Sequence, residues 1–140
     1  MGISQKCYYA IRAVFELARA PAGTTVKIGE IAERQSIPAK FLETILNQMK
    51  GGGFVESRRG AEGGYLLARS ARSLSLGEII RFVEGPLYPV PGGSRDTDLD
   101  RIFSPVFAAA EHALADVYDG VTFQDLVDRS RQTPAPDFVI

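Results

Sequence analysis

The stretch from Ser36 to Leu67 constrains the fold more than any other part of the chain. Between Pro38 and Lys50 the apolar residues recur at the spacing of one helical face, and three consecutive glycines follow. This spacing predicts an amphipathic helix, and glycine readily adopts the left-handed conformation that commonly ends one. The residues predicted to face inward are Leu42, Ile45, Leu46 and Met49.

A helix-turn-helix followed by a hairpin is the local fold that this stretch predicts. A shorter helical pattern, Ile28–Gln35, precedes Pro38, and proline disfavours helix in the residue before it but suits the first turn of a new helix. After the glycines, Phe54–Arg59 has the pattern of a strand, 60–64 that of a turn and Tyr65–Ala68 that of a partner strand. Together these elements predict a winged helix-turn-helix.

Two surfaces of this unit carry residues suited to duplex DNA. The tip of the hairpin combines glycines with Arg58 and Arg59, and a tip without side-chain bulk can enter a narrow groove. The outward face of the second helix carries small or polar groups able to approach base edges or phosphates. These groups are Ala39, Lys40, Glu43, Thr44, Asn47 and Lys50, while Lys6 and Lys27 are further candidates for holding phosphates.

A structural alternative accompanies each of these assignments. Arg58 and Arg59 also suit an ordinary solvated hairpin, and Lys40 with Glu43 suits an exposed charge pair. Within the motif, Glu43 gains a specific role as an acceptor from a cytosine amino group. We therefore expect the surface to bind DNA rather than only solvent.

The remaining periodicity predicts further helices, so the expected fold class is mainly α with one small β-hairpin. Ser75 with Glu78 predicts a capping box, and Ser104-Pro105 predicts either a kink or a helix start inside the long segment from Asp98 to Tyr118. The expected division is a DNA-binding unit at 1–84, a proline- and glycine-rich loop at 85–97, a dimerisation helix and C-terminal helix at 98–132, and a tail at 133–140.

The long segment is too apolar for a solvated helix. Burial against a second copy of the chain is the expected outcome, and folding back onto the same domain is the alternative. The residues predicted to pair across a homodimer are Leu99, Ile102, Phe103, Val106, Phe107, Ala110, Leu114 and Val117.

The overall net charge of −1 conceals an asymmetry. Residues 1–81 contain 12 Lys/Arg against 7 Asp/Glu, whereas residues 82–140 contain 4 against 10. A basic half of this kind fits a polyanionic partner. No apolar run is long enough to cross a membrane, and the N-terminal apolar pattern is interrupted by charge, so a cytoplasmic protein is expected.

Catalysis and metal binding are not expected. The single cysteine, Cys7, falls on the buried stripe of the predicted first helix, where an apolar setting makes a thiol inert. His112 has no second His or Cys one helical turn away. No nucleophile, base and orienting group occur together, and neither a metal nor another cofactor is expected.

The order of these motifs resembles the IscR-type family of bacterial winged-helix regulators. The likeness runs from about Ile3 to Arg131, and its most specific part is Arg59-Gly60 with Gly63-Gly64-Tyr65 and the Leu67-Ala68-Arg69 that follows. The resemblance implies a homodimer, joined by the long helix, that binds a palindromic operator. It also implies that the wing tip, Arg59 and Gly60, reaches the minor groove, and that the major groove meets Pro38, Lys40, Phe41, Glu43 and Thr44.

The chain departs from this family in its loop. Cluster-binding members carry three cysteines there, whereas residues 85–97 contain none, so we expect no iron–sulfur cluster. The expected function is a dimeric transcriptional regulator, a repressor rather than an activator. The alternatives are a winged-helix adaptor for protein partners, or a DNA-binding sensor that uses Cys7 or a small-molecule effector near the 85–97 loop.

Overall fold

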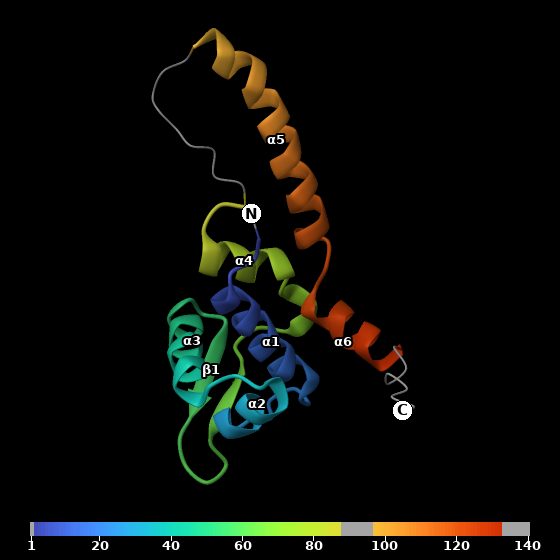
Figure 1. The fold of residues 1–140 in the computed structure, drawn as a ribbon. Helices are drawn as coiled ribbons and strands as arrows, with labels where there is room; N and C mark the ends of the chain where they lie inside the picture. The colour runs from blue at the N-terminus through green and yellow to red at the C-terminus, as the bar shows by residue number, and fades with distance from the viewer. Residues whose placement is uncertain (1, 88–96, 133–140) are drawn as a thin grey trace, which may run out of the picture.

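The computed structural model describes residues 2–87 and 97–132. Six helices, one short 3-10 helix and a two-stranded hairpin form the described part of the chain (Figure 1). In chain order they are α1 (Gln5–Arg19), α2 (Ile28–Gln35), α3 (Ala39–Gly51), β1 (Val55–Arg58), β2 (Gly64–Leu67), η1 (Ala71–Ser73), α4 (Leu76–Glu84), α5 (Asp98–Asp119) and α6 (Phe123–Gln132). The predicted fold class is confirmed.

The core lies around α1, which packs against α3, α4 and α6. The four residues predicted to face inward from α3 are all buried, and so are Ala10 and Val14 of α1. The interruption between α2 and α3 arises where Ser36 adopts the left-handed conformation, with φ at +53°, and closes α2 by donating from its N–H to Glu33. Pro38 then occupies the N-cap of α3, one residue earlier than predicted.

A charged residue in this core was not predicted from the sequence. Glu16 of α1 is only 1% exposed. Its Oε1 accepts from Gln35 Nε2 at 2.5 Å and from Arg19 Nη1 at 3.2 Å, and its Oε2 lies 3.5 Å from Arg34 Nη1. Buried charges are tolerated only when paired, and these partners supply the pairing. Because Gln35 and Arg34 end α2, the carboxylate ties the first helix to the helix-turn-helix.

The hairpin is antiparallel, with Val55 opposite Leu67 and Arg58 opposite Gly64. The short β-branched segment before α2 joins it through one bridge, in which Val26 and Tyr65 exchange backbone hydrogen bonds of 2.8 and 2.9 Å. The bridge fixes the base of the wing against the chain that enters α2.

The long helix α5 projects away from the other helices (Figure 1). It begins at a capping box between Thr97 and Asp100 and runs through Pro105, so the alternative of a helix start at Pro105 is wrong. The cap supplies hydrogen-bond partners to the backbone N–H groups of the first turn. Pro105 removes one backbone hydrogen bond, which does not end a helix of 22 residues.

An ion pair attaches the C-terminal end of α5 to α4. The Arg81 guanidinium of α4 donates to both carboxylate oxygens of Asp119, at 2.5 and 2.8 Å, and lowers the pKa of that carboxyl. A side chain at Gly77 would meet this carboxylate, because its Cβ would lie 1.9 Å from Asp119 Oδ1. The predicted capping box of α4 is also present, with Ser75 and Glu78 bonded to each other through side chain and backbone.

Candidate nucleic-acid interface

The outer face of α3 is exposed along its whole length, while its inner face is buried. Two of its side chains are restrained. The Thr44 hydroxyl donates to the Lys40 carbonyl at 3.3 Å, and the Phe41 ring meets the Tyr9 ring of α1 edge-to-face at 5.6 Å. The exposed residues include every candidate named from the sequence on α3 and its N-cap, namely Pro38, Ala39, Lys40, Phe41, Glu43, Thr44, Asn47 and Lys50. Their contacts with DNA remain predictions.

The two arginines of the wing lie in different settings. The Arg58 guanidinium donates to the Gly23 carbonyl at 3.4 Å, so it is directed back toward the turn between α1 and α2. Arg59 is exposed and makes no polar contact with the residues that the structure describes. Gly60 beside it has a φ of +101°, which favours glycine. The family resemblance already put Arg59 rather than Arg58 at the wing tip, and the contact of Arg58 with Gly23 adds a reason that the sequence does not show.

The wing and the start of α2 enclose an open groove of about 880 Å³. Lys27, Arg58 and Arg59 line it together with the free first turn of α2, and Glu30 and Glu33 line it as well. Helix N-termini carry partial positive charge that favours phosphate. The structure therefore brings together Lys27 and the wing arginines, which are 31 or more residues apart in sequence.

The other two lysine candidates lie elsewhere. Lys50 Nζ donates to Ser57 Oγ at 2.7 Å, which links the last turn of α3 to β1. Lys6 is half-buried in the first turn of α1. Neither residue lines the groove beside the wing. A phosphate contact by Lys6 therefore belongs to a different part of the surface.

No residue of α5 is buried by the described part of the chain. Leu99, Ile102, Phe103, Val106 and Val117 are among the most exposed large apolar residues, and the Phe103 and Phe107 rings stack at 6.4 Å. Phe107, Ala110 and Leu114 are half-buried or nearly so. The alternative that this stripe folds back onto the same domain does not match the structure.

The candidates for redox and metal chemistry are separated from one another. Cys7 is fully buried, and its pKa is raised to about 11 by burial and by the neighbouring Glu84 carboxylate. His112 is exposed on α5. Among the described residues no three His, Cys, Asp or Glu side chains gather in a way that could hold a metal ion. Most of the predicted sensor loop, residues 88–96, and the tail 133–140 lie outside the described residues.

A helix-turn-helix with an exposed second helix, followed by a basic wing, defines the winged helix-turn-helix class. The comparisons specify the family: residues 3–129 match the Rrf2 family, described as an iron-dependent transcriptional regulator, and the chain belongs to that family. Its relatives are transcriptional regulators rather than enzymes, as expected. The resemblance seen in the sequence is confirmed, because regulators named IscR and CymR are among these relatives.

The similarity extends through most of the chain. CymR of Bacillus subtilis, an HTH-type transcriptional regulator, is 30% identical over 90% of this chain and 89% of its own length. The structure described as that of CymR, the global cysteine regulator of B. subtilis, superposes with a TM-score of 0.80 at 29% identity, covering 92% of this chain and 98% of CymR. The structure of T. potens IscR superposes with a TM-score of 0.76 at 30% identity, covering 98% of this chain and 93% of that IscR chain.

A mycobacterial relative is more similar over a shorter region. The protein named as HTH-type transcriptional regulator Rv1287, of Mycobacterium tuberculosis, is 43% identical over 64% of this chain. The match covers 56% of Rv1287, so this chain spans little more than half the length of that relative.

The iron dependence named for the family does not fit the residues of this chain. An iron–sulfur cluster requires several thiolates. The chain has one cysteine, and it lies in the core with a raised pKa rather than at the loop before α5. We therefore assign no step to a cluster. No helix in the described part of the chain is long and apolar enough to cross a membrane.

Proposed function

We propose that this chain is a DNA-binding transcriptional regulator that acts as a homodimer on a palindromic operator and represses transcription. The observation that carries the proposal is the pairing of two exposed elements on one rigid unit. The core face of α3 is buried, so its opposite face is held outward, and the uncommitted Arg59 guanidinium lies at a glycine-rich tip. This arrangement suits simultaneous contact with two grooves.

In this proposal α3 enters the major groove. An α-helix fits that groove, and short side chains at its start allow the backbone to approach closely. Lys40 and Thr44 face the bases or phosphates, and Glu43 accepts from a cytosine amino group. The Phe41 ring is restrained at the side of this face, because it contacts the Tyr9 ring of α1 edge-to-face.

The wing reaches the adjacent minor groove. Arginine is attracted to narrow minor grooves by their enhanced negative potential, and Arg59 is the arginine at the tip that is free to insert. Lys27 and the first turn of α2 line the groove beside it and hold the intervening phosphates. Arg58 supports the wing through Gly23 and has at most a secondary part in the contact.

The α5 stripe supports the homodimer. Among the described residues, five of its large apolar side chains are exposed: Leu99, Ile102, Phe103, Val106 and Val117. A two-fold axis beside α5 would bury the same surface of both copies. Two winged units related by such an axis require a palindromic site with half-sites about 34–36 Å apart or a multiple of that spacing. Repression follows most simply, because a dimer that occupies a promoter blocks it without any further contact.

Mobility-shift titration at about 50 and 200 mM salt tests the wing assignment. With a fragment selected from genomic footprinting, Arg59→Ala should bind several-fold more weakly and should reduce the slope of log affinity against log salt by about 1. Arg131→Ala, at the exposed end of α6, is the matched control and should bind like the wild type. Equal affinity and slope for both variants would overturn the wing assignment.

The adaptor alternative is tested in the same titration. A winged helix used only for protein contacts predicts no DNA retention that depends on salt. The thiol-sensor alternative is weakened by the burial of Cys7 and its raised pKa. If a Cys7→Ser protein still releases DNA on addition of peroxide, the thiol-sensor alternative is excluded.

A further inference from the structure

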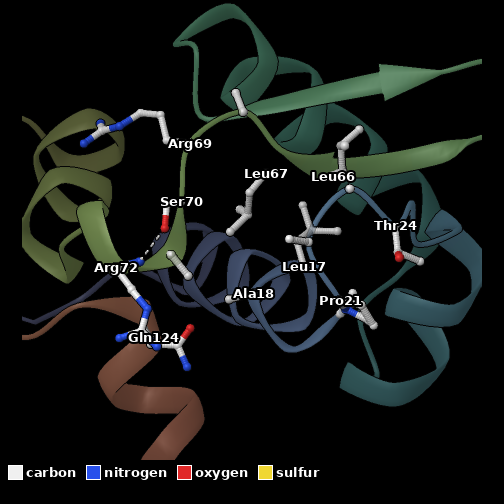
Figure 2. A pocket seen from close by; sticks show the side chains of 15 residues that line it. Leu17, Ala18, Pro21, Thr24, Leu66, Leu67, Arg69, Ser70, Arg72 and Gln124 are labelled. Atoms are coloured by element: carbon white, nitrogen blue, oxygen red, sulfur yellow. Dashed lines mark hydrogen bonds between the residues drawn. The ribbon is translucent and has the colours of Figure 1, made fainter.

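A second hollow, of about 390 Å³, lies away from the α3 face and the wing tip (Figure 2). Three segments distant in sequence form it: the end of α1 with the turn at 20–24, the segment 66–72 that runs from β2 into η1, and Gln124 of α6. Its volume falls in the range of about 300–1,000 Å³ that is typical of small-molecule sites. None of the described residues of the 85–97 loop, the region of the effector alternative, lines this hollow.

The lining combines an apolar floor with a cationic rim. Leu17, Ala18 and Leu67 point into the hollow, while Thr24 and Ser70 supply hydroxyl groups at its edge (Figure 2). Among the described residues, two arginines line it and no Asp or Glu does. Such a lining suits a ligand with an apolar body and one negative charge.

The two arginines differ in availability. Arg69 is engaged, since it donates to Glu78 Oε1 at 2.8 Å and to the Ser73 carbonyl at 2.5 Å. Arg72 is exposed, and its guanidinium makes no polar contact with the described residues. Its backbone is nevertheless fixed, because η1 starts at Ser70, whose Oγ accepts from the Arg72 N–H at 3.3 Å. The hollow thus presents one uncommitted guanidinium on a fixed backbone.

Gln124 faces the same end of the hollow as Arg72 (Figure 2). Its side-chain amide donates to Asp128 Oδ1 at 2.9 Å, which leaves the amide carbonyl as an acceptor. Asp128 itself does not line the hollow. The group next to Arg72 is therefore neutral, and it does not compete for the guanidinium as a carboxylate would.

We propose that this hollow binds a small organic monocarboxylate with an apolar body. The carboxylate pairs with Arg72, whose planar fork matches two oxygens, and the apolar body lies on Leu17, Ala18 and Leu67. Binding requires no rearrangement of the Arg69–Glu78 pair. Ligand binding at this place stands on the lining alone and does not depend on the DNA-binding proposal.

A ligand in this hollow would contact three segments that connect the wing, the helix-turn-helix and the dimerisation helix of the proposed regulator. The turn at 20–24 receives the Arg58 guanidinium of the wing at Gly23 and leads into α2. Segment 66–72 leaves the wing, and α6 follows the dimerisation helix. A ligand that binds one arrangement of these parts better than another shifts their equilibrium, and so changes DNA affinity. This coupling, unlike the binding itself, rests on the proposed function.

The binding is tested without DNA, by ¹H–¹⁵N spectra of the full chain titrated with phenylacetate, indole-3-acetate and hexanoate. The neutral amide of each acid and plain acetate are the matched controls. We expect at least one acid to shift the backbone signals of residues 70–72 and the side-chain amide of Gln124. Its neutral amide and acetate should bind at least about 10-fold more weakly, because each lacks one of the two contacts.

Arg72→Gln should weaken binding of the acid by about 10-fold or more. Arg59→Ala, which replaces an arginine outside the hollow, should leave this binding unchanged. No shift with any acid, shifts centred elsewhere, or equal binding by acid and amide would each overturn the site. In a second arm, a saturating acid should change the DNA affinity of the wild type and not of Arg72→Gln. Binding without that change overturns the coupling and leaves the proposed DNA-binding function untouched.

Discussion

Replacement of Ile102 by serine is the most direct test of the proposed dimer. Ile102 lies in the second turn of α5, near the start of its apolar stripe, and is 64% exposed in the single chain. Full burial of an isoleucine side chain contributes about 1.5–3 kcal/mol, so covering this exposed fraction contributes about 1–2 kcal/mol per copy. A two-fold interface contains the residue twice, and the variant should lose about 2–4 kcal/mol, which weakens the dimer by about 30- to 900-fold.

Sedimentation equilibrium over a concentration series measures this change directly. Glu111→Ser is the matched control, since it lies on the opposite side of the same helix and is exposed. Far-UV circular dichroism should show helix in both variants, because Ile102 lies outside the core of its own domain. An unchanged dimer constant for Ile102→Ser, or a wild-type chain that stays monomeric in the same run, refutes burial of this stripe between two copies.

Three further predictions concern the core. Folded Cys7 should react with iodoacetamide at pH 8 about 100-fold or more slowly than the urea-unfolded chain, because burial and Glu84 raise its pKa from 9.0 to about 11. Because its pKa is raised, the Cys7 thiol keeps its proton to higher pH in the folded chain than in the unfolded chain. The stabilisation from the protonated thiol is therefore complete below pH 9 and is lost as pH rises through 11. Urea unfolding measured at a series of pH values tests this. Glu16→Ala should lower the free energy of unfolding in urea by about 1–3 kcal/mol, less than for a fully buried pair because Arg19 and Arg34 remain about half in water. Glu30→Ala, exposed on α2, should change it by no more than about 0.5 kcal/mol, and equal effects of the two would contradict the role of the Glu16 network.

Local pattern determined most of the DNA-binding unit. Periodicity decided the inner face of α3, because residues three and four apart share a face in any helix. The capping box at Ser75 and the glycine-rich turn of the wing were likewise predictable, since both depend on neighbours within a few residues. The sequence by itself therefore established a winged helix-turn-helix and an unusually apolar long helix.

Tertiary structure decided which partners several charged side chains have. Glu16 looks like a solvent-facing residue in the pattern, and only the approach of Arg34 and Gln35 makes its burial tolerable. The family resemblance favoured Arg59 for the wing tip, and only the fold shows that Arg58 donates to the Gly23 carbonyl while Arg59 makes no polar contact with the described residues. Arg72 gained a candidate role only when three distant segments enclosed a hollow beside it.

The underlying reason is the range over which each interaction acts. Backbone propensity and the spacing of apolar side chains depend on residues within one or two helical turns, so the local sequence is sufficient to predict them. The partner of a charge, or the wall of a cavity, is set by packing between elements that are tens of residues apart. For this chain the sequence predicted the surface proposed to face DNA, and the fold decided which wing arginine is uncommitted and which distant segments enclose the hollow beside Arg72.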